Sequence, residues 1–78
     1  MNNIIRIKNN MTTQEKITRD DLRGIADGET RQFQLSTAKA CYSGRATAYQ
    51  LQNILGCKFR IISDYDKKTL TITRKDNN

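Results

Sequence analysis

The chain has 78 residues, with 14 Lys and Arg against 8 Asp and Glu, so its formal net charge is +6. This length admits one domain, and no apolar run approaches the ~18 residues of a membrane-spanning helix. The absence of His and the presence of only two Cys argue against a four-ligand zinc site, a disulfide-rich scaffold and Ser-His or Cys-His nucleophile pairs. We therefore expect a small cytoplasmic protein with reduced thiols that is not an enzyme and uses no metal or cofactor.

The net charge lies in the C-terminal two-thirds of the chain. Residues 1–29 carry five bases and five acids, whereas residues 30–78 carry nine bases and three acids. A basic domain favours polyanionic partners, either nucleic acid or an acidic protein surface. A charge of this size also serves solubility alone, so composition does not choose between these roles.

The N-terminal residues 1–17 are rich in Asn, Thr and Gln, and we expect them to form a flexible arm. Within this arm, residues 4–7 could form a short strand, for which the chain offers no evident partner. A short helix is predicted after Thr18, which is a suitable N-cap, and Asp21 three residues later approximates a capping box. We expect Gly28 to end this helix.

Residues 29–35 alternate between polar and apolar side chains, which predicts a strand with one buried face. From residue 38 to residue 55 the period becomes helical. Ser43 and Gly44 are a weak point in this pattern, so a helix that starts at Ser43 is the alternative. Ser36 and Thr37 are both suitable N-caps for this helix, and Gly56 is expected to close it. Its apolar stripe consists of Cys41, Gly44, Ala48, Leu51 and Leu55.

Residues 57–63 and 69–74 are the clearest strands, and the polar segment 64–68 between them predicts an antiparallel hairpin. We expect residues 75–78 to form a frayed tail. The predicted fold is therefore a single α+β domain of residues 18–74. It has two layers, a three-stranded antiparallel sheet on one long helix, in the order short helix, strand, helix, strand, strand.

A sheet covered by helices on one side leaves its other face bare. By alternation this face carries bases, long amides and hydroxyls but no acid, at Gln32, Gln34, Lys58, Arg60, Ile62, Thr69, Thr71 and Thr73. Lys and Arg suit phosphates and guanine edges, Gln suits adenine, and Thr suits phosphates and thymine methyls. These residue types are also typical of any solvated strand face. The lack of acids, together with the basic charge of the same segment, favours DNA.

We therefore expect double-stranded DNA to bind this face, with Lys58 and Arg60 as the central contacts. The flanking contacts are Gln32, Gln34, Thr71 and Thr73, and the predicted phosphate contacts are Lys39, Arg45, Lys67 and Lys68. The alternative is a protein-interaction module, such as an inhibitor of a host nucleic-acid enzyme or a virion component, that applies the same basic face to an acidic protein surface. Such a module could instead add residues 4–7 as a strand to its partner. The sequence also allows oligomers that pair through the edge strands of the sheet.

Three stretches carry a resemblance to known proteins: residues 43–51, 56–60 and 69–74. A Ser/Arg-Ala helix ending in Gly, a Lys-Phe strand and a final strand ending in Arg resemble small uncharacterised proteins of bacteriophages and mobile elements, over about residues 28–74. This resemblance implies an accessory protein of a mobile element rather than a particular chemistry.

The architecture is also similar to two sheet-reading DNA-binding domains. These are the arm-type domain of conjugative-transposon integrases and the plant ethylene-response domain, both of which read DNA with an exposed sheet. In those domains the three strands precede the helix, whereas here a helix is predicted between the first strand and the hairpin. No base-reading residue is therefore carried over from them.

Overall fold

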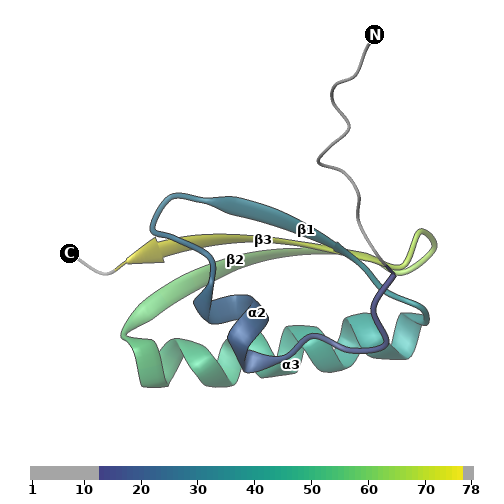
Figure 1. The fold of residues 1–78 in the computed structure, drawn as a ribbon, viewed down its shortest axis with the longest axis horizontal. Helices are drawn as coiled ribbons and strands as arrows, with labels where there is room; N and C mark the ends of the chain where they lie inside the picture. The colour runs from purple at the N-terminus through teal and green to yellow at the C-terminus, as the bar shows by residue number, and fades with distance from the viewer. Residues whose placement is uncertain (1–12, 77–78) are drawn as a thin grey trace, which may run out of the picture.

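The structure, a computed structural model, describes residues 13–76. Its elements are α2 (Arg19–Arg23), β1 (Thr30–Gln34), α3 (Ala38–Leu55), β2 (Cys57–Asp64) and β3 (Thr69–Asp76). Both helices lie on one side of the sheet, and the described chain leaves the other side uncovered (Figure 1). The predicted α+β architecture and the predicted order of elements are confirmed.

The sheet has the strand order β1-β3-β2, and both neighbouring pairs are antiparallel. The last strand in the sequence is therefore the central one. Thr71 on β3 faces Gln32 on one side and Ile62 on the other. Because all three lie in one row across the sheet, they share one of its faces.

The short helix α2 begins as its sequence predicts. The Thr18 side chain accepts a hydrogen bond from the Asp21 N–H, and an Asp21 carboxylate oxygen accepts one from the Thr18 N–H. The predicted end at Gly28 is wrong, because the helix ends at Gly24. There the chain turns Ile25 into the core, where it is fully buried, and Gly28 instead adopts a φ of 82° in the loop before β1.

The long helix α3 has the predicted limits. The Thr37 hydroxyl accepts a hydrogen bond from the Ala40 N–H, and Gly56 ends the helix in the left-handed region at a φ of 68°. Most of the predicted stripe is buried against the sheet, with Leu55 half-buried. The largest fully buried side chains are Leu22, Ile25, Leu35, Cys41, Leu51, Leu70 and Ile72. Within residues 13–76, neither helix has the length and apolar content that crossing a bilayer requires.

The domain starts earlier than the predicted boundary at residue 18. Ile17 is only 5% exposed and belongs to the core. The Gln14 N–H donates to the Gln34 carbonyl, and the Gln14 carbonyl accepts from the Ser36 N–H, both at 2.9 Å. Polar composition suggested an arm, but one buried isoleucine and two backbone hydrogen bonds are enough to fix this segment. The rest of the predicted arm, residues 1–12, lies outside the described residues.

The domain also ends later than predicted. Strand β3 continues to Asp76, and Lys75 faces Lys58 on β2. The Asp76 N–H donates to the Asp27 carboxylate at 2.9 Å, and the Asp76 carboxylate accepts from Arg74 Nε at 2.7 Å. These contacts hold the end of β3, so the predicted fraying of Lys75 and Asp76 is wrong. Residues 77–78 lie outside the described part of the chain.

Candidate nucleic-acid interface

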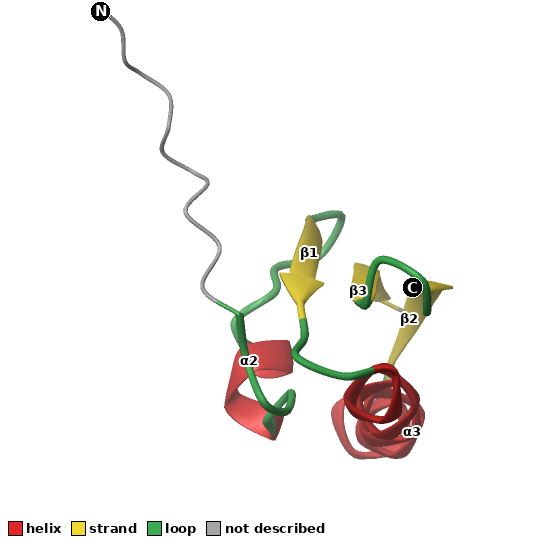
Figure 2. Cartoon of the chain, turned by 90° about the vertical axis from the view of Figure 1, so that its right-hand side faces the viewer, coloured by secondary structure: helices red, strands yellow, loops and turns green. Residues whose placement is uncertain are grey.

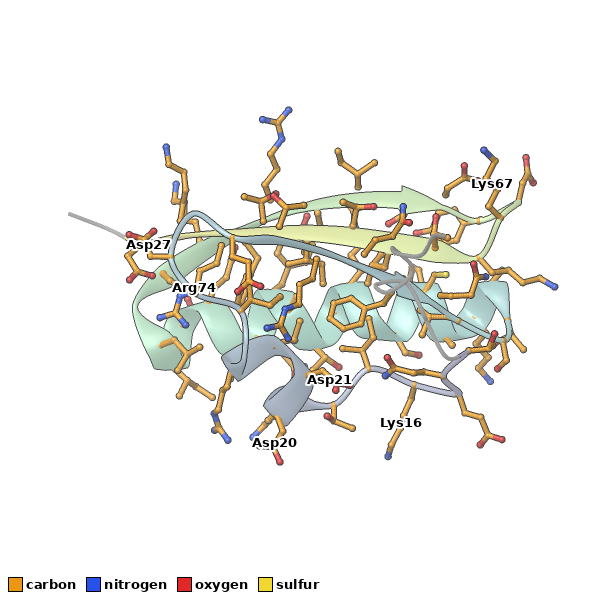
Figure 3. The ribbon with its side chains drawn as sticks, turned by 45° about the horizontal axis from the view of Figure 1, so that its top comes forward. Lys16, Asp20, Asp21, Asp27, Lys67 and Arg74 are labelled. Carbon is orange, nitrogen blue, oxygen red and sulfur yellow. The ribbon has the colours of Figure 1, made fainter. Side chains whose placement is uncertain are left out.

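The face of the sheet turned away from α2 and α3 is called the outer sheet face below. Cross-strand pairing arranges its residues in four rows: Lys58–Lys75, Arg60–Thr73–Thr30, Ile62–Thr71–Gln32 and Asp64–Thr69–Gln34. In Figure 3, Lys67 lies beyond the last of these rows, and Asp27 and Arg74 lie at the opposite end of the sheet. The predicted contacts on β1, β2 and β3 therefore share one surface.

One end of the outer sheet face is basic. Lys58 lies directly opposite Lys75, and Arg60 is in the next row. All three side chains are exposed, and none takes part in the three ion pairs found among the described residues. Like charges that face each other across a sheet are destabilising, and a bound anion would relieve this repulsion. Sequence reasoning missed Lys75, although the alternation of Thr69, Thr71 and Thr73 continues to it.

The centre of the outer sheet face is polar around one apolar side chain. Ile62 is 57% exposed and lies beside Thr71. The Gln32 amide donates to the Thr71 hydroxyl at 3.2 Å, and the Thr30 and Thr73 hydroxyls are 2.7 Å apart. These bonds fix the side chains in position, and the Gln32 carbonyl oxygen accepts no hydrogen bond within the described part of the chain. A methyl-bearing surface with nearby acceptors suits the edges of bases.

Gln34 has a structural role that the sequence did not reveal. Its Nε2 atom lies 2.9 Å from the Lys67 carbonyl and 3.3 Å from the Lys68 carbonyl. Its amide therefore ties β1 to the turn between β2 and β3. Lys68 holds a left-handed φ of 58°, and its carbonyl also accepts from the Leu35 N–H at 2.8 Å. Both residues were predicted DNA contacts, and the geometry shows each of them engaged in this junction.

The predicted absence of acids from this face is wrong. Strand β2 runs one residue further than predicted, so Asp64 faces Thr69 in the last row. Its Oδ1 atom accepts a hydrogen bond from the Lys67 N–H at 3.1 Å. An open hollow of ≈ 610 Å³ lies at this end of the face. Its lining consists of Gln32, Gln34, Ile62, Asp64, Lys67, Thr69 and Thr71.

Two predicted phosphate contacts lie in the other layer of the fold. Lys39 and Arg45 are on α3, below the sheet. Arg45 Nη1 donates to the Ser63 hydroxyl at 3.2 Å, and its guanidinium lies 5.4 Å from the centre of the Tyr49 ring. Ser63 alternates with the outward residues of β2 and so faces the helix side. The structure therefore does not bring Lys39 and Arg45 to the outer sheet face.

The two cysteines lie in the core. Cys41 is fully buried and Cys57 is 3% exposed. Burial raises the pKa of both thiols, so neither has the character of a reactive thiolate. Near β1, hydrogen bonds from the Ala26 N–H and Arg31 lower the pKa of Glu29. Within residues 13–76, no group of three or more Cys, Asp or Glu side chains forms a potential metal site.

Comparison of the chain with protein-family models, curated proteins and solved structures gave no match. The expected relation to phage and mobile-element proteins therefore stays a prediction from the sequence. The residues of the outer sheet face are therefore the feature of this chain that indicates a function.

Proposed function

We propose that the chain is a small accessory protein of a phage or mobile element that binds double-stranded DNA through the outer sheet face. The observation that carries this proposal is the cluster of Lys58, Arg60 and Lys75 at one end of an uncovered sheet. No ion pair within the described chain neutralises these three charges. Phosphate oxygens are the partners that such a cluster attracts in DNA.

The dimensions of the sheet suit the major groove. Three strands spaced about 4.8 Å apart form a surface on the order of 10 Å wide, against a groove about 12 Å wide. Eight residues of β2 or β3 extend over about 26 Å. A single β-strand is therefore long enough to contact both phosphates and bases. The basic rows would lie against the phosphate backbone, and the next rows would reach the bases.

The remaining rows offer complementary chemistry to base edges. Ile62 supplies an apolar contact of the kind that a thymine methyl takes. The Gln32 carbonyl oxygen and the Asp64 carboxylate are acceptors for the amino groups of adenine and cytosine. The positive end thus supplies affinity, whereas the centre and the acidic end supply preference for sequence.

The test is a charge reversal on the basic end, with a matched control at the start of α2 and in the segment before it. Arg60→Glu/Lys75→Glu and Lys16→Glu/Arg19→Glu each lower the net charge from +6 to +2, since each substitution removes two positive units. All four side chains are exposed. Fluorescence anisotropy with a labelled duplex of mixed sequence, measured over a range of salt concentrations, gives affinity and salt dependence.

We expect the Arg60/Lys75 variant to bind at least tenfold more weakly at low salt, with a salt slope reduced by about 1.8 for two lost phosphate contacts. The Lys16/Arg19 variant should keep most of its affinity. Equal losses in the two variants would show that net charge alone attracts the duplex. Absence of duplex binding by the wild-type chain at low salt would contradict the proposal.

A further inference from the structure

Strand β2 forms an open edge of the sheet. Figure 2 shows β2 on the opposite side of the sheet from β1, with no described segment beside it. The Phe59 N–H points to this edge, since it donates to the Gln52 side chain of α3 at 2.8 Å. In a strand, the peptide groups of alternate residues point to the same side. Ile61 and Ser63 therefore also direct their N–H and C=O groups to the open edge.

The other edge of the sheet is partly closed. Gln14 forms a parallel bridge next to Leu35 and accepts a hydrogen bond from the Ser36 N–H. Exposed strand edges are templates for pairing with another chain. Of the two edges, β2 is the longer and offers more unpaired peptide groups.

We propose that β2 pairs antiparallel with β2 of a second copy of this chain, around a two-fold axis at Ile61. The pairing makes one six-stranded sheet with a continuous outer face. In this register Lys58 of each copy faces Asp64 of the other copy. Two symmetry-related ion pairs therefore cross the interface, and each copy contributes Lys58 to one pair and Asp64 to the other. Arg60 faces Ile62.

Charge complementarity selects this register from its neighbours. Two symmetric registers form hydrogen bonds through the peptide groups of β2 that point to the open edge and also pair nearly all of its residues. One is centred on Ile61. The second of them centres on Arg60, places it against Arg60 of the other copy and leaves Lys58 opposite Ile62. Like charges directly opposite each other are unfavourable. The register at Ile61 avoids this repulsion, and it puts Lys58 and Asp64 in a non-hydrogen-bonded pair, where side chains approach most closely.

Aromatic side chains of α3 lie below the same edge. The Gln52–Phe59 and Arg45–Ser63 hydrogen bonds place this flank of α3 beside β2. Tyr42 is 68% exposed and Tyr49 is 44% exposed, and together with Arg45 and Ala46 they line a hollow of ≈ 150 Å³. Tyr and Arg are enriched in protein interfaces. A second copy paired through β2 would cover these side chains.

Gln52 competes with the second copy for one backbone group. In the proposed pairing the Phe59 N–H donates to the Ser63 carbonyl of the other copy, so the Gln52 side chain must release it. Gln52→Ala removes this competitor, and we expect the variant to associate more tightly than the wild-type chain. Weaker association of Gln52→Ala would contradict the proposed pairing.

Sedimentation of two charge variants and their mixture tests the register. Lys58→Glu replaces two attractive pairs with two repulsive ones, and so does Asp64→Lys, so we expect each variant alone to dimerise at least tenfold more weakly than the wild type. Mixing the two restores both pairs in a heterodimer, which should form as well as the wild-type dimer. Circular dichroism melts verify that each variant folds. A wild-type chain that remains monomeric, or a mixture that stays dissociated, would overturn the proposal.

Cysteine cross-linking reports the position of the axis. In the proposed register the Cα atoms of the two Ile61 residues are about 5.5 Å apart, which a disulfide can bridge. Ile61→Cys should therefore cross-link on oxidation. Ile62→Cys is the control, because Ile62 is 57% exposed but faces Arg60. Preferred cross-linking of Ile62→Cys or Arg60→Cys would refute the axis at Ile61.

Dimer formation and DNA binding share Lys58 and Asp64, so the two proposals are tested at different residues. The dimer is tested with Lys58→Glu and Asp64→Lys, which leave Arg60 and Lys75 unchanged. The DNA interface is tested with Arg60→Glu/Lys75→Glu. Loss of duplex binding with intact dimers would contradict the proposed function alone. Monomers that bind DNA would contradict the dimer alone.

Discussion

Ile17 fills the space that Gly44 leaves open on α3. A Cβ atom added at Gly44 would lie 2.8 Å from Ile17 Cδ1 and 3.1 Å from Leu70 Cδ2. The segment before α2 thus reaches the core through a site where the long helix has no side chain. This contact joins the N-terminal part of the described chain to the long helix, at a point where the helix also meets Leu70 of the central strand.

Ile17→Ala should destabilise the domain by about 2–5 kcal/mol, because it removes a core side chain and leaves a cavity. Gly44→Ala should also destabilise it, since overpacking costs about 1–3 kcal/mol and the gain in helix propensity is about 1 kcal/mol. Urea unfolding measures both changes. Lys16→Ala is the control and should alter stability by less than about 0.5 kcal/mol. An Ile17→Ala variant as stable as the control would show that this segment does not pack on α3.

Gln34→Ala should destabilise the domain by about 1 kcal/mol, because it removes the amide that bonds to the Lys67 and Lys68 carbonyls. Gln32→Ala is the matched control on the same strand. Its amide bonds only to the exposed Thr71 hydroxyl within the described chain, so its loss should matter less. Thermal unfolding of the two variants measures the difference. A larger loss for Gln32→Ala would contradict the assignment of Gln34 to the turn.

Cys41 and Cys57 should resist thiol reagents in the folded protein. Both are buried, and burial raises the pKa of each thiol, so the reactive thiolate is scarce even at mildly alkaline pH. Labelling should be about 10²–10⁴-fold slower than in denaturant, given a stability of roughly 3–5 kcal/mol for a core of this size. Mass spectrometry after timed labelling reads the rates. Rapid modification of either cysteine without unfolding would show that its site is open to solvent.

The sequence predicted those features that depend on nearby residues. The capping box of Thr18 and Asp21, the N-cap Thr37 and the C-cap Gly56 each act within a few positions along the chain. Alternation within strands also identified the outer sheet face. In each case the physical cause lies inside the element, so a local pattern is sufficient to find it.

Features that depend on distant contacts were not predictable in this way. Ile17 looked like part of a polar arm, because Gly44 and the core into which it packs are far away in sequence. Asp64 has two roles at once. It is the last paired residue of β2, and its carboxylate also accepts from the turn N–H of Lys67. A turn-forming side chain gives no sign that its backbone still belongs to the strand.

The central position of β3 governs when the sheet can form during synthesis. β1 and β2 are joined only through β3 within the described chain, and β3 is the last of the three to leave the ribosome. Until Thr69–Asp76 emerges, β1 and β2 each lack the neighbouring strand with which they pair in the described sheet. The β2–β3 hairpin closes over a short turn, whereas Thr30 must find Thr73 across a sequence separation of 43 residues. Assembly of this sheet is therefore a late event that follows translation of nearly the whole domain.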